Sequence, residues 1–119
     1  ANIHALSLCP NVVLKFSGLT MPLVGFGFDR RPRPPSSDDV SKAVSPYLAE
    51  CLGAFGSRRC MFASNFPVDA ASCGYTVLWN AFHRACDLQG CTPSERSALF
   101  AGTAAEVYRL GDLARTARL

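Results

Sequence analysis

The sequence of 119 residues contains few histidines, little net charge and no long apolar run. The two histidines, His4 and His83, stand far apart, so their spacing does not predict a metal site. The formal charge of +3 is lower than a nucleic-acid-binding surface requires. No segment approaches the roughly 18 apolar residues of a membrane-spanning helix, and we recognise no secretory signal. We therefore expect neither nucleic acid nor membrane as a partner.

The cysteines show no spacing of a metal or redox motif. None of the 6 forms a C-x-x-C pair, and several stand among apolar neighbours, where cysteine acts as a small hydrophobic residue. We therefore expect reduced thiols in a cytoplasmic protein. The even number keeps disulfide bonds open as an alternative, while a thiol enzyme is the interpretation that the sequence favours least. The cysteines are Cys9, Cys51, Cys60, Cys73, Cys86 and Cys91.

Apolar residues are abundant, at 49% of the chain against 18% charged residues, which is enough for one small domain with a core. Residues 11–18 and 60–68 combine β-branched, aromatic and other apolar side chains, as buried strands do. The prolines crowded into residues 25–37 predict a loop. Residues 111–119 are expected to form a tail.

Three helical regions are predicted. The first covers residues 38–55, with Ser37 as its N-cap and Pro46 dividing it into two helical pieces. The second covers residues 74–89, where apolar side chains recur on one helical face. The third covers residues 93–110 and begins with Thr-Pro-Ser-Glu, which is a capping box with proline at the first helical position.

The order of strand, helix and strand predicts a βαβ unit with parallel strands, and hence an α/β fold. Two parallel strands alone leave an unpaired hydrogen-bonding edge on each side. Either the strands belong to a larger sheet, or a second copy covers the edges and the apolar faces in a homo-oligomer. The sequence leaves both interpretations open.

Three segments resemble, in order and spacing, the C-terminal part of a known family. They are PNVVLKFSGL (10–19), FGSRRCMFASNFPVD (55–69) and TPSERSALFAGTAAEVYRL (92–110). The family is the amidohydrolase-related family, of the amidohydrolase 2 type, within the TIM-barrel metal-dependent hydrolases. The resemblance implies that residues 1–119 are the last βα units of a (β/α)8 TIM barrel. The barrel is incomplete as given, because a whole one takes about 250 residues.

The resemblance directs attention to the end of the second strand, because the carboxyl ends of the strands surround the active site of such barrels. It implies an aspartate, as metal ligand or general base, at the position of Asn65. An amide cannot take up a proton, so Asn65 is expected to orient a water or to bond a substrate carbonyl. Asp69 is the second catalytic candidate, as a replacement carboxylate, and a helix-capping role fits its position equally. Ser64 is a substrate-binding candidate.

Lys15 and Ser17 on the first strand are further substrate-binding candidates. A lysine within a buried strand needs a partner, and an anionic substrate at the barrel mouth would be one. Alternatively, the Lys15 side chain extends to the surface. The resemblance implies metal-binding histidines on preceding strands. No metal ligand is therefore assigned in this chain, and a divalent metal is expected only as a cofactor of the complete enzyme.

The first functional hypothesis is a hydrolase or lyase of the amidohydrolase type, acting on a small carboxylated or lactone-type substrate. In it this chain supplies one side of the active-site mouth and is expected to be inactive without the missing N-terminal part. The alternative is a stand-alone non-catalytic fragment, or a domain that dimerises through its open sheet edges.

Overall fold

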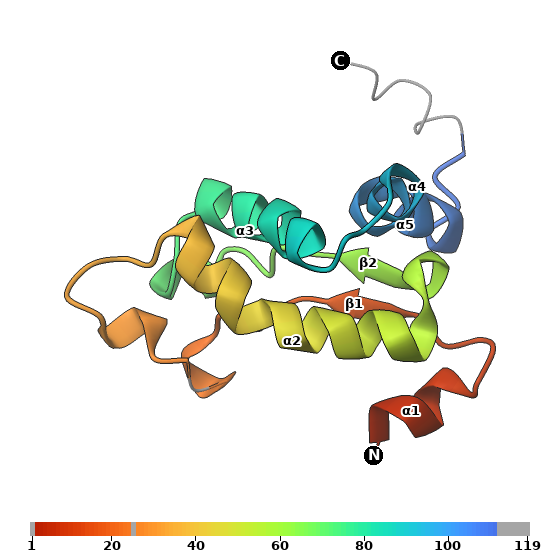
Figure 1. The fold of residues 1–119 in the computed structure, drawn as a ribbon, viewed down its shortest axis with the longest axis horizontal. Coiled ribbons are helices and arrows are strands. Elements are labelled where there is room, and N and C mark those ends of the chain that lie inside the picture. Colours follow the sequence, from red (N-terminus) through yellow and green to blue (C-terminus); the bar gives the residue numbers. More distant parts are fainter. Residues whose placement is uncertain (1, 25, 112–119) are drawn as a thin grey trace.

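The computed structural model of the chain describes residues 2–24 and 26–111, so the predicted tail at 111–119 lies, except for Gly111, outside the described residues. None of the helices in the described residues combines the length with the apolar composition that a bilayer crossing requires. A π-helical stretch, η5, joins the last two helices. The main elements are α1 (Asn2–Ser7), β1 (Leu14–Phe16), α2 (Ser37–Phe55), β2 (Cys60–Phe62), α3 (Tyr75–Leu88), α4 (Pro93–Ser97) and α5 (Thr103–Val107) (Figure 1).

β1 and β2 form a parallel two-stranded sheet in which Leu14 lies opposite Cys60. α2 connects the strands, so the predicted βαβ unit is present. Both strands are shorter than the residues 11–18 and 60–68 that the sequence predicts.

The strands end early because of the backbone at two positions. Gly18, shortly after β1, has a φ of 71°, and Asn65, shortly after β2, has a φ of 54°. Both values lie in the left-handed region, which an extended strand does not use. The chain therefore turns away from the sheet at both positions, and loops begin at the carboxyl ends of the two strands.

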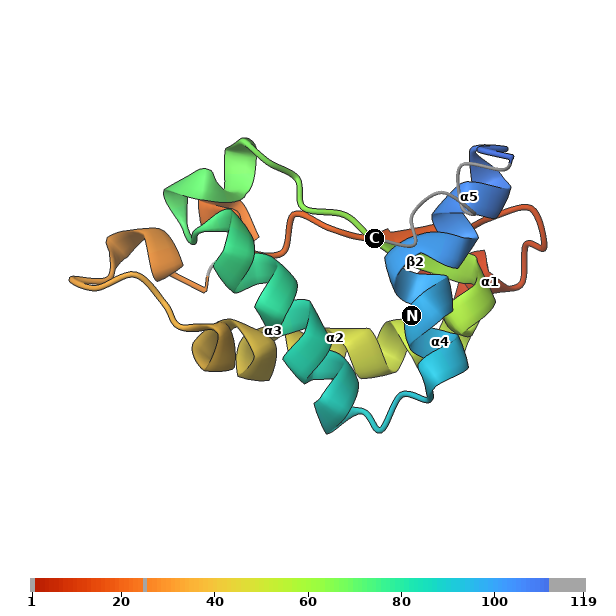
Figure 2. The ribbon, with the colours of Figure 1, turned by 90° about the horizontal axis from the view of Figure 1, so that it is seen from above.

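α2 and α3 pack against one another and lie on the same side of the strands (Figure 2). Between them and the sheet lies a cluster of aromatic rings. Phe62 of β2 stacks on Phe82 of α3, with the ring centroids 4.5 Å apart and the ring planes at 6°. Phe16 of β1 contacts both rings edge-on. Because these contacts bury large apolar areas, they hold the short strands against the helices.

α2 is one continuous helix, and the predicted division at Pro46 is wrong. Proline removes one backbone hydrogen bond within a helix. Here the loss is offset by packing, because Val44 and Leu48 on either side of Pro46 are fully buried. The Gln89 side chain also donates to the carbonyl oxygen of Ser45 at 3.2 Å, which ties α3 to this turn of α2.

The N-cap of α2 is Ser36 rather than the predicted Ser37. Ser36 Oγ accepts a hydrogen bond from the Asp39 N–H, and the Asp39 carboxylate accepts one from the Ser36 N–H at 2.9 Å. This capping box satisfies two backbone donors, and a cap one residue later would lose that reciprocal pair. The predicted loop at 25–37 also contains a short 3-10 turn, Phe28–Arg30.

The third helical region begins as predicted and is then interrupted. The capping box of Thr92 and Glu95 is confirmed, since the Glu95 carboxylate accepts from the Thr92 N–H at 2.8 Å. The π-helical stretch η5 (Ala98–Gly102) follows α4, and α5 ends at Val107. Residues 93–110 are therefore not one regular α-helix.

Candidate functional site

The loops that follow β1 and β2 meet at the carboxyl end of the sheet. The Thr20 hydroxyl, after β1, donates a hydrogen bond to Asp69 Oδ2 at 2.7 Å. The Asn65 side-chain amide, after β2, donates to Asp69 Oδ1 at 2.9 Å. Gly18 lies against the Asn65 amide. We call these four residues, Gly18, Thr20, Asn65 and Asp69, the strand-end cluster.

Asp69 is a buried carboxylate whose two oxygens both accept hydrogen bonds. Asp69 is 1% exposed to solvent. No Lys, Arg or His within residues 2–24 and 26–111 forms an ion pair with its carboxylate. It stands in a short 3-10 turn, Val68–Ala71, in which no side chain caps the first residues. The arrangement suits a group that orients its neighbours rather than one that a substrate could reach.

Asn65 is held at the edge of this cluster with one polar atom free. Its positive φ is a conformation that asparagine tolerates better than most residues. Its Oδ1 forms no hydrogen bond in the described part of the chain. The fully buried side-chain atoms without a partner there are Ser72 Oγ and Trp79 Nε1, so Asn65 Oδ1, on a partly buried residue, is not fully buried. An amide oxygen can accept a hydrogen bond but cannot take up a proton.

Gly18 is required beside Asn65 for two reasons. Its φ of 71° favours glycine. A Cβ added at Gly18 would also lie 3.3 Å from Asn65 Nδ2 and 3.0 Å from Cε of Met21. The close approach of the two loops at this point therefore depends on the absence of a side chain at Gly18.

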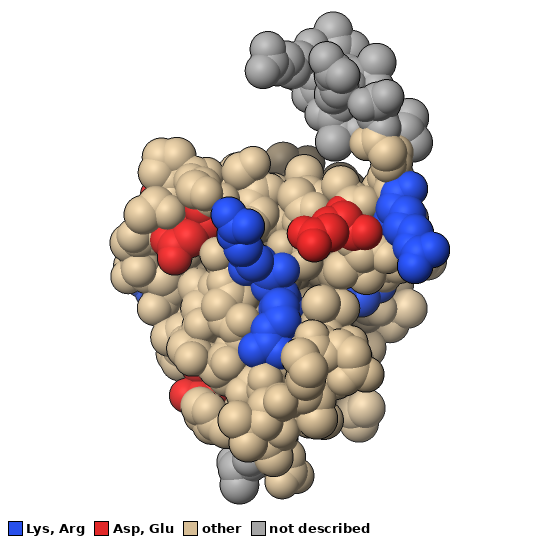
Figure 3. Space-filling view, turned by 90° about the vertical axis from the view of Figure 1, so that its right-hand side faces the viewer, with Lys and Arg blue, Asp and Glu red and all other residues tan. Residues whose placement is uncertain are grey.

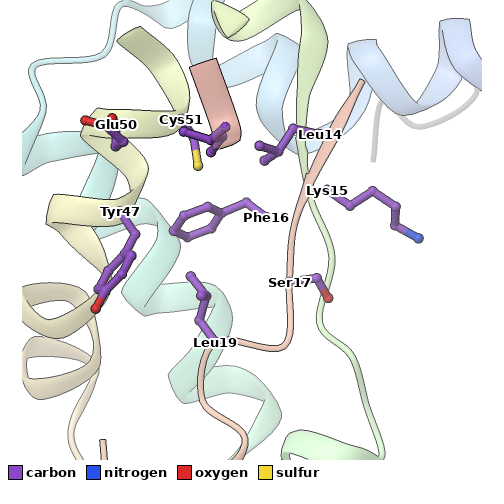
Figure 4. Close-up of a pocket in the computed structure, with 9 residues that line it drawn as sticks. Leu14, Lys15, Phe16, Ser17, Leu19, Tyr47, Glu50 and Cys51 are labelled. Carbon is purple, nitrogen blue, oxygen red and sulfur yellow. The ribbon is translucent and has the colours of Figure 1, made fainter. Parts of the chain in front are cut away.

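The other three candidates are Ser64, Lys15 and Ser17. In the part of the chain that the structure describes, none of their side chains forms a hydrogen bond with the strand-end cluster. Ser64 Oγ accepts from the Phe66 N–H at 3.3 Å, which is a local turn contact. Lys15 Nζ lies 5.9 Å from the centroid of the Tyr108 ring. Lys15 and Ser17 point to the same side of β1 (Figure 4).

The opposite side of β1 carries an apolar pocket of about 240 Å³. It lies between β1 and α2, and the side chains of Lys15 and Ser17 point away from it (Figure 4). With so few polar groups, this pocket suits packing rather than chemistry. The side chains that extend toward it are mainly apolar: Ile3, Leu14, Phe16, Leu19, Tyr47 and Cys51.

Charged side chains do not form one continuous patch on the face that Figure 3 shows. This face lies at the end of the molecule with α1, α4 and α5, and basic and acidic groups alternate on it. Elsewhere Arg84 pairs with Asp38 at 3.0 Å and Arg96 with Asp87 at 2.6 Å. Such exposed pairs contribute little to stability individually.

The described residues do not supply a metal site by themselves. Within 2–24 and 26–111, no three His, Cys, Asp or Glu side chains come together as metal ligands would. His4 Nε2 lies 2.6 Å from Glu50 Oε1 at the surface, and His83 stacks on Phe100 with centroids 4.1 Å apart.

The cysteines are free thiols, and burial makes most of them poor nucleophiles. Burial raises the pKa of Cys60 and of Cys86 to about 12. It also raises the pKa of Cys51 and Cys73. None of these four provides the readily ionised thiol that a thiol enzyme requires.

Thr20 and Gly18 are the members of the cluster that sequence reasoning missed, and Thr20 is the one with a polar side chain. It stands among apolar residues after β1, and only its contact with Asp69, 49 residues away, reveals its role. In the sequence, Thr20 is distinguished only as a hydroxyl residue that closely follows a glycine at the end of a predicted strand.

The family model for amidohydrolases matches residues 1–110. The chain is 41% identical to the uncharacterised protein y4mH of Sinorhizobium fredii over 108 aligned residues. The aligned region is 91% of this chain and 31% of that protein. It is 34% identical to the L-fucono-1,5-lactonase of Burkholderia multivorans over 110 aligned residues. The aligned region is 92% of this chain and 34% of the lactonase.

Two crystal structures of an amidohydrolase from Burkholderia multivorans, one with bound zinc and one with bound HEPES, have similar folds. Each has a TM-score of 0.74 and 31% identity, over 89% of this chain and 34% of theirs. The chain thus spans about a third of the length of these relatives. The predicted fold class is confirmed: the two parallel strands and their helices are part of a TIM-type barrel.

Proposed function

The chain belongs to the amidohydrolase family, and from this premise we propose that it forms one side of the active-site mouth of a hydrolase acting on a lactone-type substrate. Hydrolase chemistry in general is supported by the family. The lactone is suggested by the L-fucono-1,5-lactonase to which the chain is similar.

The observation that carries the proposal is the strand-end cluster. Polar side chains from two separate loops converge at the carboxyl ends of two parallel strands, which is where enzymes of barrel architecture place their active sites. The amide oxygen of Asn65 there accepts no hydrogen bond from the described residues and is not fully buried. In the proposed reaction this oxygen accepts a hydrogen bond from the attacking water or from a substrate hydroxyl, and so orients the bonded group.

The cluster does not provide a general base. Asn65 is an amide, and Asp69 is buried with both carboxylate oxygens engaged. The proton of the attacking water must therefore be taken up by a group outside the strand-end cluster. Because the chain spans about a third of its relatives, we expect residues 1–119 alone to be inactive.

The test is a hydrolysis assay of the full gene product that contains this chain, with a panel of sugar lactones and simple esters. We expect acid release from at least one lactone. Asn65→Ala should lower kcat/KM about tenfold, as expected for one lost hydrogen bond to the reacting groups. Asn80→Ala, which removes an exposed amide on α3, is the matched control and should change kcat/KM little. A gene product that hydrolyses no lactone would overturn the proposal.

A second candidate is a domain that associates with its own copy. The apolar pocket of about 240 Å³ beside the unpaired edge of β1 favours it, because such a surface is unfavourable in water. Light scattering of residues 1–119 would show a molecular mass that rises toward a dimer with concentration. A constant monomer mass would rule this candidate out.

A further inference from the structure

We infer that Asp69 and Thr20 are positioning residues that fix the side-chain amide of Asn65 with its oxygen toward the mouth. The site would then select a water or a substrate hydroxyl, which donate hydrogen bonds, over a substrate carbonyl. This inference rests on the proposed function, since it assigns a direction to the same hydrogen bond. Thr20 acts on Asn65 through Asp69, and the sequence analysis did not single it out.

The orientation of the Asn65 amide follows from the chemistry of its partner. An ionised carboxylate only accepts hydrogen bonds, so the atom 2.9 Å from Asp69 Oδ1 must be Nδ2. The opposite orientation would place two oxygens at that distance, which repel. Nδ2 also packs against Gly18, where an added Cβ would lie 3.3 Å away. The amide nitrogen therefore faces Asp69 and Gly18, and the amide oxygen lies on the other side of the amide group.

Asp69 can orient Asn65 because it is itself held firmly. Its other carboxylate oxygen accepts from the Thr20 hydroxyl at 2.7 Å, a short charge-assisted bond. The Asp69 N–H donates to the Asn65 carbonyl oxygen at 3.3 Å, and the Asp69 carbonyl oxygen accepts from the N–H groups of Ser72 and Cys73. Burial at 1% exposure keeps water from competing for these bonds.

The consequence is a preference among substrates. A hydroxyl placed against Asn65 Oδ1 gains a hydrogen bond, whereas a carbonyl or carboxylate oxygen at the same place is repelled. A lactone that carries hydroxyls around its ring is therefore favoured over an otherwise similar lactone without them. A site that bonds a hydroxyl discriminates strongly against analogues lacking it.

The orientation is tested first by NMR of the full gene product, through hydrogen exchange of the asparagine side-chain amides. In the wild type, the Asn65 amide should exchange at least about tenfold more slowly than the exposed amide of Asn80, because it is hydrogen-bonded and partly buried. Asp69→Asn and Thr20→Val should each bring the Asn65 exchange rate toward that of Asn80. Equal rates for Asn65 and Asn80 in the wild type would overturn the inference.

The selectivity is tested with D-glucono-1,5-lactone and δ-valerolactone, which differ in their hydroxyls. In the wild type, kcat/KM should favour the hydroxylated lactone. Asp69→Asn should reduce this preference about tenfold, mainly through a higher KM for the hydroxylated lactone. Thr20→Val should act in the same direction, and it serves alone where Asp69→Asn does not fold.

A merely structural role for Asp69 predicts a different result. Its variants would then lower kcat/KM for the two lactones by the same factor, and this outcome overturns the inference while the proposed function stands. If the wild type hydrolyses neither lactone nor any other, the proposed function fails. The exchange rates still decide the orientation of the amide in that case.

Discussion

At the level of single residues, backbone conformation selects what can stand at the two strand ends. Gly18 and Asn65 both have positive φ values, and their side-chain positions face one another. Glycine supplies the conformation without strain, and asparagine does so with little. The contact between the two loops therefore depends on a missing side chain at one residue and a short polar one at the other.

Gly18→Ala should destabilise the protein more than Gly27→Ala, which is its matched control. Both glycines have similar positive φ values, 71° and 66°, so each alanine costs about 1–2 kcal/mol of unfolding free energy. Only at Gly18 does the new Cβ approach other atoms, at 3.0 and 3.3 Å, which adds about 1–3 kcal/mol. Urea unfolding measures the difference, and equal losses at the two positions would contradict the close contact with Asn65.

At the level of elements, helix α2 shows how packing outweighs local preference. Proline within a helix removes a hydrogen bond, yet α2 continues through Pro46, which is itself exposed. The buried face of the helix is uninterrupted on both sides of it. Pro93 stands in contrast, because it occupies the first turn of α4, where its missing N–H has no helical partner.

Pro46→Ala is expected to stabilise the protein by about 2 kcal/mol, because it restores the lost hydrogen bond while freeing the unfolded chain somewhat. Pro93→Ala is the control, and it should change the unfolding free energy by less than about 0.5 kcal/mol. Thermal and urea unfolding of both variants provide the measurement. A destabilised Pro46→Ala variant would mean that α2 is divided at this residue.

The capping boxes of α2 and α4 should lose their contribution to stability in acid. Hydrogen bonds from Ser36 lower the pKa of Asp39, and hydrogen bonds from Thr92 lower the pKa of Glu95. A lowered native-state pKa stabilises the fold above the ordinary pKa, and this stabilisation is lost as the pH falls through the native value. The unfolding free energy should therefore decline below about pH 4.

The double variant Asp39→Asn, Glu95→Gln isolates this effect. It should be less stable than the wild type at pH 7, and the difference between the two should shrink as the pH is lowered toward 3. Unfolding by urea at a series of pH values checks it. A difference that stays constant over this range would show that the carboxylates do not contribute through their charge.

At the level of the whole molecule, the packing of the helices on one side of the sheet determines which groups meet solvent. Cys60 lies on β2 and Cys86 on α3, and both are fully buried in the core. Cys9 lies between α1 and β1 and is exposed. The fold therefore buries some cysteines and exposes others, although the sequence alone does not distinguish them.

A thiol reagent should react with Cys9 first and with Cys60 and Cys86 last. Burial raises the pKa of the latter two to about 12, so they remain protonated near neutral pH and are also inaccessible. Mass spectrometry after timed labelling gives the order, and all 6 thiols should react rapidly in denaturant. Cys9→Ser should remove the fastest reaction alone. Early labelling of Cys60 would contradict the packing of β2.

The two strands match only part of the barrels to which the chain is similar. The chain spans about a third of its relatives, and β1 has an unpaired edge beside the apolar pocket. The sheet of a complete barrel closes on itself and leaves no free edge. The strand-end cluster lies at the carboxyl ends of the two strands, which is the side of such barrels that carries the active site.

The sequence by itself determined the features that depend on neighbouring residues. The capping box at Thr92, the helix at 74–89 and the βαβ order follow from local hydrogen bonding and hydrophobic periodicity, and the structure contains all three. The resemblance of three segments also determined the family. Asn65 and Asp69 were candidates because polar residues at a strand end are recognisable along the chain.

Only the tertiary structure decided the features that depend on residues distant in sequence. The continuity of α2 at Pro46 depends on burial against the sheet and α3, which local preference does not contain. The bond from Thr20 to Asp69 joins residues 49 apart, and it explains why a carboxylate without a cation is buried there. The physical reason is the same in both cases: the free energy comes from contacts that exist only once the strands have been brought together.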